Sequence, residues 1–249
     1  MFKEELFGKE YFEEGKGLKS KRVYNWENMA VFFKVISDAI INVIKPAAVL
    51  DVGCAKGYLV SLLNEYGIDA YGVDISSYAV SMSQGNIKNK LKVVDIEKDS
   101  MPFTDSQFDL VVILEVLEHL SRFDHLLNEA KRIVKKGGHI LITTPSPWGR
   151  HARADATHIS VHKRSFWIEL FRRHGLLLVR ADDALWRDFK SAFLKRFNKE
   201  MDSNLPSTVI AKIFIRMGKI GKSIRNNLFP WVDFFSPLCS DQILLFKKA

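Results

Sequence analysis

The stretch AAVLDVGCAKG, residues 47–57, decides the fold class of this chain. Its first six residues form a short apolar run with a single acid near the end, which is typical of a buried strand. Gly53 and Gly57 then let the backbone turn sharply and approach a ligand closely. Residues 58–66 (YLVSLLNEY) follow with helical periodicity, and Gly67 ends that helix. The stretch therefore predicts a strand, a tight turn and a helix.

Strand-like and helix-like segments continue to alternate along the chain. The expected strands lie at residues 69–75, 91–96, 108–114, 138–144, 176–181 and 242–247, and the expected helices at residues 26–44, 125–134 and 165–174. We expect Ser76 to cap a further helix and Lys135–Gly138 to form a turn. Strands that are apolar on both faces and separated by helices predict an α/β fold with a doubly wound parallel sheet. Such sheets bind ligands at the carboxyl ends of their strands.

The turn after the first strand matches neither common phosphate-binding signature. A P-loop requires lysine after its second glycine, whereas Lys56 precedes Gly57. The dinucleotide fingerprint requires glycine at the position of Ala55. Asp51 just before the turn suits a ligand that carries an ammonium group instead. A strand–helix turn without any ligand has a similar composition, so the loop alone does not decide the function.

Four successive strands end in an acid, namely Asp51, Asp74, Asp95 and Glu115. Asp74 stands where a doubly wound fold holds the two hydroxyls of a ribose. Asp95 is placed to accept a hydrogen bond from an exocyclic amine, and the aliphatic Ile96 to cover a planar base. Each acid alone could be a helix cap or a solvent-facing residue. Four of them at one edge of the sheet predict a nucleoside site.

The ordered motifs resemble class I S-adenosylmethionine-dependent methyltransferases, in particular the branch of quinone-biosynthesis and glycan enzymes. The motifs are VLDVGCAKGYL, YGVDIS, VVDIEKDSMPFTDSQFDLVVILEVLEHL and VKKGGHILITTPSP. They cover roughly residues 47–147, with weaker similarity around Thr157-His158. The resemblance implies a seven-stranded, mostly parallel, Rossmann-like sheet whose last strand, 242–247, is antiparallel. Ala55 departs from the glycine of many relatives, and we expect no effect if its backbone angles are ordinary.

The resemblance also implies S-adenosylmethionine as the cofactor, S-adenosylhomocysteine as the product, and a role for each residue at the strand ends. The residues implied to line the methionine moiety and its sulfonium end are Asp51, Gly53, Cys54, Ala55, Gly57, Leu114 and Glu115. Asp74 is implied to bind the ribose hydroxyls, and Ile75 to lie against the adenine. Asp95 is implied to meet the adenine amine, and the backbone of Ile96 a ring nitrogen.

Methyl transfer from a sulfonium needs mainly alignment of the acceptor, but a hydroxyl acceptor must also lose a proton. The candidate bases are His158, in a polar loop after the fifth strand, and His119, just past the fourth strand; His162 is a weaker candidate. Each could instead make only a structural hydrogen bond. The chain has no H-E-x-x-H motif, and the spacing of its histidines predicts no metal site.

The expected function is methyl transfer to a small-molecule, glycan or lipid-linked acceptor, at oxygen, by direct in-line transfer. Nucleic acid is not the expected acceptor, because residues 114–117 lack the Asn/Asp-Pro-Pro-aromatic sequence of base amino methylation. Cys54 and Cys239 are also poorly placed for attack on a pyrimidine ring. The alternatives are an RNA-directed methyltransferase, a non-catalytic cofactor-binding module and a nucleotide-dependent oxidoreductase.

The predicted organisation has four parts: an N-terminal helical cap at 1–46, the cofactor-binding core at 47–182, a helical lid or acceptor-side insertion at 183–240, and the final strand at 241–249. The sequence predicts a cytoplasmic protein. It has only two cysteines, its N-terminus does not resemble a signal peptide, and it has no apolar run long enough to span a membrane.

The net charge of +8 is compatible with nucleic acid, anionic lipid, an acidic substrate or only solubility. Residues 207–227 form a basic amphipathic pattern, which would either touch the inner membrane surface peripherally or pack on the core. Tyr11 and Tyr24 would either fold over the cofactor or serve packing alone.

Overall fold

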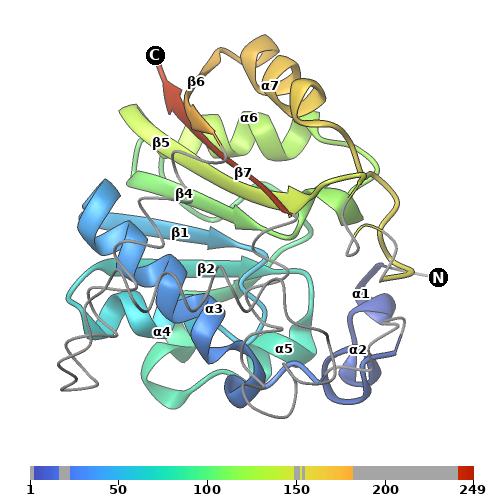
Figure 1. Cartoon of the computed structure of the whole chain (residues 1–249). Coiled ribbons are helices and arrows are strands. Elements are labelled where there is room, and N and C mark those ends of the chain that lie inside the picture. Colours follow the sequence, from blue (N-terminus) through green and yellow to red (C-terminus); the bar gives the residue numbers. More distant parts are fainter. Residues whose placement is uncertain (1–2, 17–22, 149–151, 153–154, 182–240) are drawn as a thin grey trace, which may run out of the picture.

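The computed structural model describes residues 3–16, 23–148, 152, 155–181 and 241–249. Within this part of the chain, helices cover both faces of a seven-stranded sheet (Figure 1). The insertion predicted at 183–240, with its amphipathic stretch 207–227 and Cys239, lies outside the described residues. No helix of the described part is both long and apolar enough to cross a membrane.

The sheet has the strand order β3-β2-β1-β4-β5-β7-β6. Its strands are β1 (Ala48–Val52), β2 (Asp69–Asp74), β3 (Leu91–Val93), β4 (Phe108–Leu114), β5 (Val134–Pro145), β6 (Leu176–Ala181) and β7 (Asp241–Lys248). The first five run parallel, and β7 is antiparallel to both β5 and β6. The chain reverses its winding between β1 and β4, which is where doubly wound sheets bind ligands. The predicted fold class and the antiparallel last strand are confirmed.

The helices are α1 (Lys3–Leu6), α2 (Lys9–Glu14), α3 (Trp26–Ala39), α4 (Tyr58–Glu65), α5 (Ser77–Ser81), α6 (Asp124–Ile133) and α7 (Arg164–Arg173), with 3-10 turns at Gly85–Lys90 and Leu117–His119. Helices α3 to α7 overlap the helices predicted from the sequence, and α1 and α2 lie within the predicted N-terminal helical cap. The Ser76 side chain accepts a hydrogen bond from the backbone N–H of Ala79 and so caps α5 as expected.

Three local predictions are wrong in part. The expected turn Lys135–Gly138 is a bulge inside β5, because pairing with β4 begins at Val134 opposite Phe108 and resumes only at His139 opposite Leu110. The expected strand 91–96 ends at Val93, because the carbonyl of Asp95 accepts hydrogen bonds from two later N–H groups and turns the chain. The expected helix 26–44 is α-helical only to Ala39 and ends in a π-helical turn.

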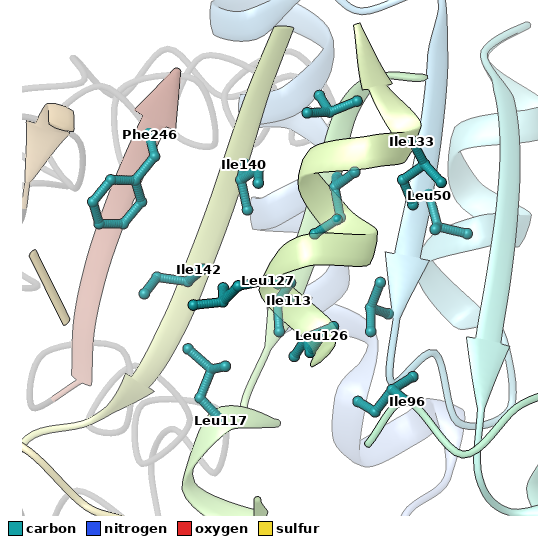
Figure 2. Close-up of a cluster of buried hydrophobic side chains, with 14 of the residues drawn as sticks. Leu50, Ile96, Ile113, Leu117, Leu126, Leu127, Ile133, Ile140, Ile142 and Phe246 are labelled. Carbon is teal, nitrogen blue, oxygen red and sulfur yellow. The ribbon is translucent and has the colours of Figure 1, made fainter. Parts of the chain in front are cut away.

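Two hydrophobic cores hold the strand ends in place. One lies between the sheet and the helices α3 and α4. Figure 2 shows the other core, in which α6 lies over the strands, with Leu126, Leu127 and Ile133 facing Leu50, Ile113, Ile140 and Ile142. All seven side chains are fully buried, and each such burial contributes roughly 1.5–3 kcal/mol. Rigid packing up to the carboxyl ends of β1 and β4 therefore fixes the groups that follow those strands.

Candidate active site

The loop between β1 and α4 is built from left-handed backbone positions. Gly53 has a φ of 80° and Gly57 a φ of 75°. The N–H groups of Gly53 and Cys54 both donate to the carbonyl of Val73, at 2.8 and 3.0 Å, which ties the loop to the end of β2. A Cβ at Gly53 would collide with a methyl group of Val116, so only glycine fits there. The two glycines thus shape the loop and bring it against the residue after Glu115.

Ala55 occupies a third left-handed position, with a φ of 48°. The expectation that alanine has no effect here assumed ordinary backbone angles, and the structure does not meet that condition. Alanine in this region costs on the order of 1–2 kcal/mol compared with an ordinary backbone conformation. The strain is offset locally, because the Ala55 N–H donates to the Asp74 carboxylate at 2.7 Å.

Cys54 contributes to the loop through its backbone. Its side chain is only 2% exposed and belongs to the core under α3 and α4. A Cβ at Gly72 of β2 would lie 2.6 Å from the Cys54 sulfur, so the glycine makes room for the cysteine. Burial is the main cause that raises the pKa of the Cys54 thiol. This inert packing agrees with the expectation that Cys54 is no nucleophile.

Asp74 holds the cofactor loop and the end of β2 together. One carboxylate oxygen accepts from the Ala55 N–H at 2.7 Å and the other from the Ser76 N–H at 2.8 Å. Burial raises the pKa of Asp74, and the backbone hydrogen bonds partly oppose this. This clamp was not predicted, although an aspartate two residues before a helix-capping serine is a pattern that such turns favour.

Asp51 is a buried acid at the centre of the site, with 3% of its surface exposed. Burial, and then the negative charge of Asp74, raise its pKa to about 8. None of the basic side chains in the described part of the chain contributes to this pKa. A buried carboxylate without a cation is costly, and a ligand with a positive charge removes that cost. The ammonium and sulfonium groups of S-adenosylmethionine fit this requirement.

The predicted adenine side lies beside Asp74 at the neighbouring strand. The N–H of Val94 donates to the Asp74 carbonyl at 2.9 Å, which places the residues after β3 next to the end of β2. The Asp95 side chain is 18% exposed and pairs with Lys98 at 2.8 Å. Ile96 is buried in the core under α6, whereas Ile75 is partly exposed. Asp74 and Ile75 thus lie at the end of β2, and Asp95 and Ile96 shortly after the adjacent β3. Of the two acids, only Asp95 forms a salt bridge with a described residue.

Glu115 follows β4 in a left-handed conformation, with a φ of 53°. Its N–H donates to the carbonyl of Thr143 on β5 at 3.0 Å. Burial raises the pKa of the Glu115 carboxyl, and the neighbouring Thr143 and Glu118 side chains partly oppose this. A non-glycine residue in this conformation costs roughly 1–3 kcal/mol and is most often found at functional sites. Leu114 before it is 9% exposed.

The two predicted bases lie together near the carboxyl end of β5, beside Glu118 and Thr144. The rings of His119 and His158 meet edge to face, with centroids 4.8 Å apart. Glu118, which the sequence analysis did not single out, is fully buried beside them and accepts a hydrogen bond from the Thr144 hydroxyl at 3.1 Å. The Glu118 carbonyl also accepts from the N–H groups of Ile159 and Ser160, which anchors the loop that carries His158.

His162 does not belong to this group. Its ring stacks on Phe166 at 3.8 Å and packs edge-on against Trp167 and Phe123. Its carbonyl accepts a hydrogen bond from Gln242 at 2.8 Å. Burial lowers the pKa of His162. These contacts assign His162 to packing between α7 and the last strand.

The N-terminal segment lies across the carboxyl ends of the strands (Figure 1). The Tyr11 hydroxyl donates to Asp155 at 2.9 Å, and the Ser76 hydroxyl donates to the carbonyl of Phe7 at 2.6 Å. Glu13 of α2 pairs with the buried Lys56 of the cofactor loop at 2.7 Å. Tyr24 is buried close enough to Asp51 and Asp74 for their charges to raise the pKa of its hydroxyl, after the larger effect of burial. Tyr11 therefore contacts the histidine side of the site, and Tyr24 lies near the two buried acids.

A family model described as a methyltransferase domain matches residues 28–181. The chain belongs to this methyltransferase family. It is 28% identical over 123 residues to the ubiquinone biosynthesis O-methyltransferase of Pelagibacter ubique, covering 49% of this chain and 50% of that protein. It is 31% identical over 104 residues to norajmaline N-methyltransferase of Rauvolfia serpentina, covering 39% and 36% of the two chains. The chain thus spans about half or less of the length of these curated relatives.

The fold of this methyltransferase is that of solved S-adenosylmethionine-dependent enzymes. A SAM-dependent methyltransferase from Archaeoglobus fulgidus superimposes with a TM-score of 0.57 at 17% identity, over 91% of this chain and all of the other. The predicted membership in the S-adenosylmethionine-dependent class is confirmed. The roles of the individual site residues stay predictions.

Proposed function

We propose that this methyltransferase transfers a methyl group from S-adenosylmethionine to an oxygen atom of its acceptor. The acceptor is a small molecule, a glycan or a lipid-linked molecule. One observation carries the proposal: the buried Asp51 and Asp74 belong to β1 and β2, on one side of β4 in the sheet, whereas the histidine pair lies next to Glu118, which contacts Thr144 of β5 on the other side. The first group suits a cationic methyl donor, and the second suits an acceptor that must lose a proton.

On the donor side, the cofactor supplies an activated methyl group when it is bound. Asp51 would neutralise its ammonium group, with the backbone of Gly53, Cys54, Ala55 and Gly57 around the methionine chain. Asp74 already uses one lone pair of each oxygen on the protein backbone, and its other lone pairs would receive the ribose hydroxyls. Ile75, Asp95 and Ile96 would hold the adenine, and Leu114 and Glu115 would lie beneath the sulfonium. For Asp95, this requires one carboxylate to accept hydrogen bonds from both Lys98 and the adenine amine.

On the acceptor side, His158 is the better placed base. Its Nε2 lies 4.0 Å from both Glu118 and Asp155, and its side chain is 9% exposed. Two carboxylates at this distance stabilise the imidazolium that forms when the ring takes a proton from a hydroxyl. His119 is the second candidate. An acceptor oxygen is favoured over nitrogen because a hydroxyl needs such a base, and the named ubiquinone relative methylates oxygen.

The acceptor class is tested with a methyl-labelled cofactor. The full chain is incubated with separate pools of small metabolites, lipids, glycans and RNA, and the label in each pool is counted. A His158→Gln variant and a boiled sample serve as controls. We expect label in the small-molecule, lipid or glycan pool, where alkali releases it as methanol from a methyl ester and leaves it in place in a methyl ether. Label in RNA alone would contradict the proposal and favour the RNA-directed alternative.

A further inference from the structure

The side chains of Glu118, His119 and His158 are arranged as possible ligands of one metal ion. One ligand atom of each side chain, a carboxylate oxygen or an imidazole nitrogen, lies within 4.8 Å of the other two. Two imidazoles and one carboxylate are a frequent ligand set of divalent transition-metal ions. The spacing along the chain did not predict this, because the fold joins the 3-10 turn Leu117–His119 to a loop that follows β5.

The protonation of His119 can be worked out from its neighbours. The Thr157 hydroxyl donates to Asp155 at 2.6 Å, so its oxygen is left to accept from His119 Nδ1 at 2.9 Å. The Thr157 carbonyl lies 3.3 Å from the same nitrogen. His119 therefore carries its proton on Nδ1 and its lone pair on Nε2. Metal-binding histidines are oriented in this way, with one ring nitrogen donating to a carbonyl or another polar group and the other facing the ion.

Glu118 is held in a similar way. Its Oε2 accepts from the Thr144 hydroxyl at 3.1 Å, whereas its Oε1 lies 4.0 Å from His158 Nε2. The neighbouring Glu115 adds a second carboxylate, whose Oε1 is buried and accepts no hydrogen bond from the described residues. A hydrogen-bonded ligand carboxylate with another acid beside it favours a doubly charged cation.

The dimensions of the cluster suit an ion after a small adjustment. Zn²⁺ lies about 2.0–2.2 Å from nitrogen and oxygen ligands, so two of its ligands are roughly 3.0–4.4 Å apart. The largest separation here, 4.8 Å, closes to that range when one side chain moves by less than about 1 Å. The ring of His158 is on a loop, and its Nε2 lies 4.0 Å from both Glu118 and Asp155, so neither of these contacts is a short hydrogen bond that would hold the ring in place.

We propose that Glu118, His119 and His158 bind one divalent transition-metal ion of the Zn²⁺ and Mn²⁺ class, with Glu115 next to the site. Three protein ligands leave coordination positions for water or for an acceptor oxygen. A bound ion would lower the pKa of that oxygen and so replace His158 as the group that promotes loss of the proton. This last role rests on the proposed function, whereas the binding of the ion does not.

The test is a calorimetric titration of the chelator-treated full chain with ZnCl₂ and, separately, MnCl₂. We expect one ion per chain, and at least a tenfold weaker affinity in Glu118→Gln and in His158→Ala. His125→Ala is the matched control, because His125 lies in the exposed part of α6 and contacts Asp99, and its affinity should equal that of the wild type. Circular dichroism shows whether each variant is folded. His119→Gln provides a second variant if Glu118→Gln does not fold.

The outcomes separate this inference from the proposed function. S-adenosylhomocysteine is titrated into the metal-free protein and, separately, into the protein loaded with the ion. It should bind to both. No ion binding by the wild type, or equal ion binding by the folded variants, overturns the metal site even if S-adenosylhomocysteine binds. Ion binding without S-adenosylhomocysteine binding supports the metal site and contradicts the proposed function.

Discussion

The raised pKa of Asp51 makes cofactor binding depend on pH in a definite direction. Burial and the charge of Asp74 raise the pKa of Asp51 to about 8, so the free protein holds a proton there at neutral pH. A ligand whose ammonium group lies on Asp51 requires the ionised form and must expel this proton. A group of this pKa is about 0.3% ionised at pH 5.5 and about a quarter ionised at pH 7.5. The affinity for S-adenosylhomocysteine should therefore rise roughly 75-fold over these two pH units.

Calorimetry in two buffers with different ionisation enthalpies measures both the affinity and the number of protons released. At pH 7 we expect about 0.9 protons released per ligand bound, from the ionised fraction of such a group. Asp51→Asn should bind more weakly, release no proton and show no such pH dependence. Asp105→Asn is the control, because Asp105 is an exposed acid paired with Arg132 away from the site. A flat pH profile in the wild type, or proton release that persists in Asp51→Asn, would refute the reasoning.

Three further predictions concern stability. The raised pKa of Asp51 means that the ligand-free protein should lose stability as the pH rises from about 4 to about 8, since Asp51 ionises near pH 4 in the unfolded chain but keeps its proton in the folded one. Chemical denaturation measures the free energy of unfolding at each pH, and its decrease with pH should be smaller in Asp51→Asn. Gly72→Ala should lower the free energy of unfolding by about 1–3 kcal/mol, because the new Cβ would lie 2.6 Å from the Cys54 sulfur, whereas Gly85→Ala, with no atom within 4 Å of its Cβ, should be near neutral in the same denaturation assay. Tyr11→Phe removes the hydrogen bond to Asp155 and should lower the free energy of unfolding by about 1 kcal/mol while speeding cofactor association in stopped-flow measurements. An unchanged association rate would contradict the interpretation that Tyr11 folds over the cofactor.

The sequence was sufficient for the sheet and for the acids at its edge. Buried parallel strands have nearly continuous apolar sequences, so the predicted bounds of β4, Phe108–Leu114, agree with the structure. Asp51, Asp74 and Glu115 then follow as the residues at the strand ends. The pair Gly137-Gly138 favours a turn locally, but β4 pairs with β5 on both sides of it, at Val134 and again from His139, so the segment becomes a bulge within one strand.

Contacts between distant loops and the backbone angles of single residues could not be predicted from the sequence. The left-handed conformation of Ala55 depends on the Asp74 carboxylate and on packing that no local pattern encodes. The cluster of Glu118, His119 and His158 depends on two backbone hydrogen bonds from the later loop to the Glu118 carbonyl. Glu118 was not among the predicted site residues, because its full burial follows from the fold and not from a local pattern.

A crystal structure of the full chain with S-adenosylhomocysteine tests the central claim most directly, namely that the strand ends of β1, β2 and β4 form the cofactor site. We expect the ammonium group within roughly 3 Å of an Asp51 oxygen and the ribose hydroxyls at the same distance from Asp74. The adenine should lie between Ile75 and Ile96 with its amine toward Asp95. Ligand density elsewhere on the molecule, or a ligand bound in the reverse direction with its adenine at Asp51, would contradict the account.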